Sequence, residues 1–118
     1  MQDISHHLQA VLKRMAIASS QVGRDAADIQ LLAVSKTMPI AAIVAAYEAG
    51  QRHFGENYVQ EAVEKINTLA HLPLTWHLIG SLQSNKTAEV AAHFHWVHSI
   101  ERLKIAQRLS AQRAADLP

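Results

Sequence analysis

The chain has 118 residues, of which 49% are hydrophobic, 18% are charged and none is cysteine, and its formal net charge is +1. This composition is typical of one globular domain, which we expect to span residues 1–118, and it excludes disulfides, thiolate metal sites and cysteine nucleophiles. The near-neutral charge argues against a nucleic-acid surface, and without a membrane-length apolar run or an export signal we expect a cytoplasmic protein.

Hydrophobic periodicity predicts helices that alternate with short strands. An apolar stripe that includes Leu8, Leu12 and Met15 predicts a first helix from Ile4 to Gln21. The predicted strands are residues 29–34, 53–55, 75–79 and 96–100. Further helices are expected from Pro39 to just before Gly50, over residues 58–69, from the end of an 80–86 loop to about residue 93, and from Glu101 to just before Asp116.

The stretch around Lys36 carries the clearest functional signal. Four apolar residues, 31–34, are typical of a strand buried on both faces, and Pro39 suits the first turn of a helix. Lys36 is therefore expected at the carboxyl end of a strand, where parallel α/β folds bind ligands. Partial burial would disfavour an ammonium. The following helix N-terminus would disfavour it too and would favour a nearby anion, which suits condensation with a phosphorylated aldehyde. The alternative is a loop lysine that extends into solvent.

The spacing of the strands indicates the fold class. They begin at residues 29, 53, 75 and 96, so successive starts are 24, 22 and 21 residues apart. Such strand–helix alternation predicts parallel pairing through right-handed crossovers. Neither Gly-x-Gly-x-x-Gly after the first strand nor Gly-x-x-x-x-Gly-Lys occurs, which leaves an α/β fold of the parallel (β/α) TIM-barrel type. Four units are about half of the eight in a complete barrel.

Three ordered motifs carry a resemblance to a known family. They are Leu32-Ala33-Val34-Ser35-Lys36-Thr37, then Phe54-Gly55-Glu56-Asn57-Tyr58-Val59-Gln60-Glu61, then Trp76-His77-Leu78-Ile79-Gly80-Ser81-Leu82-Gln83-Ser84-Asn85-Lys86, and His98-Ser99-Ile100-Glu101 continues the match. With these motifs the chain resembles the pyridoxal phosphate homeostasis proteins (the YggS/PROSC family) over essentially its whole length.

The resemblance implies a fold like the amino-terminal domain of alanine racemase, with pyridoxal 5′-phosphate at the barrel mouth. It implies that Lys36 holds the cofactor as a Schiff base, that Asn57 lies beside it, and that His77, Gly80 and Ser81 line or support the pocket. It also implies a role in cofactor homeostasis, delivery to pyridoxal-phosphate-dependent apoenzymes and amino-acid balance. No reaction is expected, because racemisation needs a base on each face of the substrate carbon and Lys36 is the only obvious one.

Family members are roughly twice as long, enough for the eight strands of a closed barrel. The other half would hold the serine- and glycine-rich loops that bind the cofactor phosphate. A half-barrel would expose unpaired edges at its first and fourth strands, which predicts self-association, with two copies completing one barrel.

Other patterns leave alternatives open. The Gly80–Lys86 loop would also suit a sugar-phosphate or nucleotide-binding barrel enzyme, and a chain that does not retain the cofactor would be a structural module. His93, His95 and His98 resemble metal ligands, but the first two precede the fourth strand, at the opposite end from the mouth, so no metal site is predicted. Glu61 is expected to be solvated rather than paired with Glu56, because it lies a turn into its helix.

Overall fold

A computed structural model describes residues 3–118, so the first two residues of the predicted 1–118 unit lie outside the described residues. Five α-helices, two short 3₁₀-helices and four strands follow one another in the described part of the chain. In order they are α1 (Ile4–Gln21), η1 (Ala26–Asp28), β1 (Ala33–Val34), α2 (Ile40–Glu48), β2 (His53–Glu56), α3 (Val59–Thr68), β3 (Thr75–Leu78), η2 (Ser84–Lys86), α4 (Thr87–His93), β4 (Trp96–Val97) and α5 (Leu103–Gln112).

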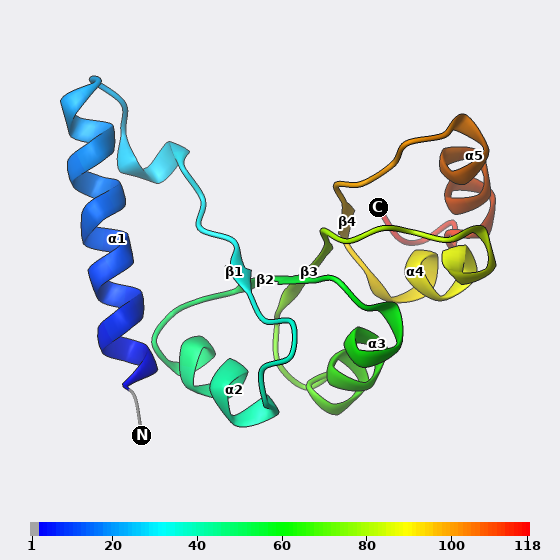
Figure 1. Ribbon diagram of the computed structural model, residues 1–118, viewed down its shortest axis with the longest axis horizontal. Coiled ribbons are helices and arrows are strands. Elements are labelled where there is room, and N and C mark those ends of the chain that lie inside the picture. Colours follow the sequence, from blue (N-terminus) through cyan, green and yellow to red (C-terminus); the bar gives the residue numbers. More distant parts are fainter. Residues whose placement is uncertain (1–2) are drawn as a thin grey trace.

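Helix α1 has the predicted bounds. It begins after Asp3, whose carboxylate accepts the backbone N–H of His6 at 3.2 Å and so satisfies one of the free N–H groups of the first turn. Gly23 follows the helix with φ of 72°, a conformation that glycine adopts without a steric penalty. In Figure 1, α1 and α5 lie at opposite ends of the molecule, with the strands between them.

The four strands form one parallel sheet in the order β1-β2-β3-β4, which confirms the predicted topology. The first strand is much shorter than the predicted residues 29–34. Ala33 pairs with Phe54 and Val34 with Gly55. Because β2 begins at His53, residues before Leu32 lie beyond its end and have no ladder partner among residues 3–118. The fourth strand is likewise two residues long instead of five.

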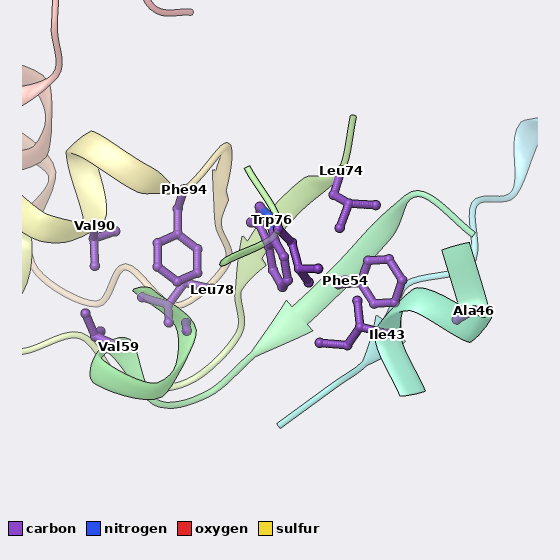
Figure 2. Close-up of a cluster of buried hydrophobic side chains, with 11 residues drawn as sticks. Ile43, Ala46, Phe54, Val59, Leu74, Trp76, Leu78, Val90 and Phe94 are labelled. Carbon is purple, nitrogen blue, oxygen red and sulfur yellow. The ribbon is translucent and has the colours of Figure 1, made fainter. Parts of the chain in front are cut away.

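The core lies on one face of this sheet, under α2, α3 and α4. Phe54 of β2 lies beside Ile43 of α2, and Phe94 lies close to Leu78 of β3 (Figure 2). The rings of Phe54 and Trp76 are 5.8 Å apart, which joins these two groups into one cluster. Alternate residues of each strand therefore face the helices, and the residues between them face the other way.

The second face of the sheet is open in the described residues. Val34 at the end of β1 is 52% exposed and Trp96 of β4 is 58% exposed. The prediction that residues 31–34 are buried on both faces is therefore wrong, because helices cover only one face of this part of the sheet.

No helix of the described chain is long and apolar enough to cross a membrane.

The carboxyl-terminal helix α5 begins two residues later than predicted and packs against α4. Ile105 is its buried residue. Arg113, just past its end, donates from Nη1 to the carbonyls of Ala91 at 2.5 Å and Phe94 at 2.7 Å. These bonds hold the end of the chain against α4, because a charged donor strengthens each of them.

Candidate functional site

The candidate site lies at the carboxyl edge of the sheet, where the parallel strands end together. Val34 is paired with Gly55, so Lys36 and Asn57 stand at equivalent positions two residues further along. Leu78 is the last residue of β3, and Gly80 follows it by two residues. The strand order thus brings the segments that carry Lys36, Asn57 and Gly80 to one edge, as the sequence predicted.

The side chain of Lys36 is exposed, so its predicted partial burial is wrong. The reason is that β1 is an edge strand whose second face has no covering layer in the described residues. The backbone on both sides of Lys36 is nevertheless held firmly. Ser35 is buried and Thr37 is fixed by a hydrogen bond, so the exposed Lys36 side chain projects from an anchored segment.

Lys65 of α3 anchors Ser35 by a side-chain hydrogen bond. Its Nζ donates to the Ser35 carbonyl at 2.7 Å and to Glu56 Oε2 at 3.1 Å, and the Ser35 hydroxyl donates to the same Glu56 oxygen. Glu56 is 0% exposed and Lys65 is 6% exposed, so this is a buried ion pair. Burial raises the pKa of Glu56, and the bonds from Ser35 and Lys65 oppose that rise.

Glu61 extends this network to Thr37, which corrects the prediction of a solvated Glu61 unable to converge with Glu56. Its Oε2 lies 3.0 Å from Lys65 Nζ and accepts the backbone N–H of Thr37 at 2.9 Å. The Thr37 bond, followed by the bond from Lys65, lowers the pKa of Glu61. Thr37 has φ of 61°, which is unfavourable for a β-branched residue and persists only where its surroundings enforce it. The Glu61 bond is part of that enforcement.

Asn57 and Gly80 meet at the ends of β2 and β3. A Cβ added to Gly80 would lie 2.4 Å from the carbonyl oxygen of Asn57, so only glycine permits this approach. The side-chain oxygen Oδ1 of Asn57 is buried and has no hydrogen-bond partner among the described residues. An unsatisfied buried acceptor is costly and is commonly explained by a ligand or water.

The structure places His77 and Ser81 apart from this pair. His77 pairs in register with Gly55 and therefore lies within the sheet, two residues before the level of Asn57. Burial lowers the pKa of His77 to about 4, and His53, His98 and His95 add to the effect. Ser81 is exposed and lines a 260 Å³ cavity with Leu82, Ser99, Glu101, Arg102 and Ile105. The Ser99 hydroxyl donates to the Gly80 carbonyl and so ties this cavity to the edge.

His93, His95 and His98 do not converge. His93 Nδ1 lies 2.8 Å from the Glu89 carbonyl, His95 Nδ1 accepts the backbone N–H of Trp76 at 2.9 Å, and His98 contacts His77. Within residues 3–118 no three histidine, cysteine, aspartate or glutamate side chains are grouped as metal ligands would be.

The network of Ser35, Glu56, Glu61 and Lys65 was missed from the sequence, although signals for it exist. Glu56 alternates with Phe54, which predicts that both face the helices and that Glu56 needs a buried cation. The four-residue spacing of Glu61 and Lys65 favours an ion pair along the helix, but only the fold shows that Lys65 points at the strand ends.

The fold and its polar edge define the class: a parallel α/β protein of the barrel type, with a lysine and an asparagine at the strand ends. No family model matches the chain. The pyridoxal phosphate homeostasis protein of Pseudomonas aeruginosa is 57% identical over 118 residues, 100% of this chain and 51% of that protein. The namesake from Escherichia coli K12 is 54% identical over 121 residues, 100% of this chain and 52% of that protein.

Solved structures agree with the sequence relatives. PipY of Synechococcus elongatus with pyridoxal phosphate bound matches with a TM-score of 0.73 and 50% identity, over 86% of this chain and 47% of that one. A Bifidobacterium adolescentis protein described as unknown matches with a TM-score of 0.83 and 33% identity, over 93% and 49%. These comparisons confirm the resemblance: the chain is homologous over its length to pyridoxal phosphate homeostasis proteins, and it spans about half the length of the curated relatives it matches.

Proposed function

We propose that this chain binds pyridoxal 5′-phosphate through Lys36 and acts in cofactor homeostasis and delivery, without catalysing a reaction of its own. The observation that carries the proposal is an exposed lysine on an anchored segment, at the same sheet edge as an unsatisfied buried acceptor, Asn57 Oδ1. The names of the curated relatives and the cofactor-bound PipY structure support it.

The chemistry of these residues fits the cofactor. Pyridoxal phosphate supplies an aldehyde that condenses with a lysine amine to a Schiff base and releases water. Exposure leaves Nζ of Lys36 accessible, and the Ser35 and Thr37 anchors restrict where the amine can reach. Asn57 would offer hydrogen bonds to the polar cofactor, and Gly80 would keep Asn57 in place. His77 would support the pocket from within the sheet, and Ser81 would support it from the rim.

Two features support a carrier over an enzyme. The ring of Tyr47 lies under Arg52, with the guanidinium carbon 4.0 Å from the ring centroid, and Tyr58 precedes α3 with its side chain exposed. A second base would have to stand across the substrate carbon from Lys36, and no contact among the described residues holds either tyrosine there. A Schiff base on an exposed lysine is also accessible to an acceptor amine, which suits transfer to pyridoxal-phosphate-dependent apoenzymes.

Trapping with borohydride tests the assignment of Lys36. The protein is incubated with pyridoxal phosphate, reduced, digested and analysed by mass spectrometry. We expect the modification on the Lys36 peptide and its loss in Lys36→Ala, whereas the control Lys13→Ala, at an exposed position of α1, should retain it. Comparable labelling of Lys13, Lys86 and Lys36 would show that the aldehyde samples surface amines and would refute the assignment.

Self-association is a separate proposal, supported by the sheet. Among the described residues, strands β1 and β4 each have one unpaired edge, and the exposed Val34 and Trp96 lie on these strands. A second copy that covered both edges would bury apolar surface and pair free backbone groups. Light scattering should therefore give twice the chain mass at high concentration, and Val34→Lys should lower the dimer fraction. A folded monomer at every concentration would refute the proposal.

A further inference from the structure

Three histidines form a continuous hydrogen-bonded row along the open side of the sheet. His53 Nδ1 lies 3.0 Å from His77 Nε2, and His77 Nδ1 lies 2.9 Å from His98 Nε2. His53 begins β2, His77 lies inside β3, and His98 directly follows β4. The row therefore runs obliquely across three neighbouring strands, from the start of one to the end of another.

The ends of the row reach solvent and its centre does not. His77 is 4% exposed, His53 is half-buried and His98 is exposed. The ring centroids of His77 and His98 are 5.2 Å apart and their planes differ by 15°, so the two imidazoles lie in nearly parallel planes. The plane of Trp96 lies within 7° of that of His77, at 6.0 Å. His98 precedes Ser99, which bonds to Gly80, so this end of the row adjoins the carboxyl edge.

The chemistry of imidazole gives this row a direction. A neutral imidazole has one N–H donor and one nitrogen acceptor, so a neutral His77 that bonds on both sides donates to one neighbour and accepts from the other. Burial lowers the pKa of His77 to about 4. Three neighbouring histidines add to this effect: His53 of β2, and His95 and His98, which lie on either side of β4. His77 is therefore neutral at pH 7 and donates through one ring nitrogen while it accepts through the other.

We infer that His53, His77 and His98 are a proton relay that connects the start of β2 with the carboxyl edge of the sheet. In one orientation each ring carries its proton on Nε2. When a proton binds Nδ1 of His98, the proton on Nε2 of that ring passes to Nδ1 of His77. The proton on Nε2 of His77 then passes to Nδ1 of His53. Finally, the proton on Nε2 of His53 leaves to water. One proton has then entered at His98 and one has left at His53, and all three rings finish with the proton on Nδ1. This inference goes beyond the cofactor role and does not depend on it.

The row can be tested first in the unmutated protein. In ¹⁵N-labelled protein, each N–H···N bond should give a measurable coupling between the two ring nitrogens that share the proton. We expect two such couplings at His77, one to His53 and one to His98, together with the ring-nitrogen shifts of a neutral imidazole at pH 7. Absence of either coupling, or a protonated His77 at that pH, would overturn the relay.

Transfer along the row is tested by solvent exchange. The buried ring proton of His77 should exchange quickly, because it passes to the neighbour that accepts it while a new proton arrives from the other neighbour. In the double variant His53→Phe/His98→Phe, exchange should slow by about an order of magnitude or more, since it then requires local opening. His71→Phe, at an exposed position outside the row, is the control and should leave exchange unchanged. Equal exchange rates in the double variant and the unmutated protein would overturn the relay.

Discussion

Replacement of Lys65 by methionine is expected to lower the free energy of unfolding by about 3–5 kcal/mol, the usual cost of removing one partner from a buried ion pair. The side chain of Lys65 donates to Ser35, Glu56 and Glu61. Methionine has a similar length and keeps the apolar contacts but none of these bonds. Glu56, which is 0% exposed, would then be a buried carboxylate without its cation. Urea denaturation monitored by circular dichroism measures the difference.

Lys86→Met is the matched control. Its Nζ lies 4.0 Å from Glu89 Oε1, in a pair whose side chains are partly exposed, and such pairs contribute about 0–1 kcal/mol. In the Lys65→Met background, Glu56→Gln should restore part of the lost stability, because a neutral amide no longer buries an unpaired charge. If the two methionine variants were equally stable, the network would not hold the edge together as we describe.

The order of the elements could be predicted from the sequence because it depends on local signals. The apolar period of α1 and the turn residues between strands are short-range features, and they place every α-helix and strand within a few residues of its observed position, apart from the ends of β1 and β4. The placement of Lys36 and Asn57 at one edge follows from parallel pairing alone, since parallel strands end on the same side.

The length of β1 could not be predicted, because it depends on where its partner begins. Residues 29–31 have the composition of a strand, but β2 offers them no ladder position. The exposure of Lys36 has the same origin: it depends on what covers the second face of the sheet, and periodicity in residues 31–34 indicates only that they are apolar. Local sequence carries no information on either point.

The convergence of Glu61 on Glu56 was missed for a different reason. Sequence spacing relates Glu61 to Lys65 on one helix, but the contact with Glu56 depends on how α3 packs against β2. The histidine row has a similar cause, because His53, His77 and His98 lie more than 20 residues apart in sequence and meet only through the strand order. Both are tertiary features, so a pattern within one element does not show them.

The tight contact at the ends of β2 and β3 makes Gly80→Ala the second change with a large expected effect. The new Cβ would lie 2.4 Å from the Asn57 carbonyl oxygen, 2.8 Å from its Cα and 3.0 Å from its carbonyl carbon. These are backbone atoms and cannot rotate away, so the strand ends must separate. Forcing extra atoms into a packed site typically costs about 1–3 kcal/mol. We expect a loss of stability in this range and displacement of Asn57, measured by urea denaturation and by the amide shifts of Asn57.

Gly55→Ala is the control variant. It shows whether the loss of stability in Gly80→Ala comes from the contact with Asn57 or from adding a methyl group at any glycine near the strands. At Gly55 the nearest atoms to an added Cβ are Ile79 Cδ1 at 3.1 Å and side-chain atoms of Leu32 at 3.4 Å, which can move by a rotamer change. Gly55→Ala should therefore cost less and leave the Asn57 signals in place. Because the proposed cofactor site needs Asn57 beside the strand ends, Gly80→Ala should also weaken retention of pyridoxal phosphate more than Gly55→Ala does. Equal stability and equal retention in the two variants would show that the approach of Gly80 to Asn57 does not shape the site.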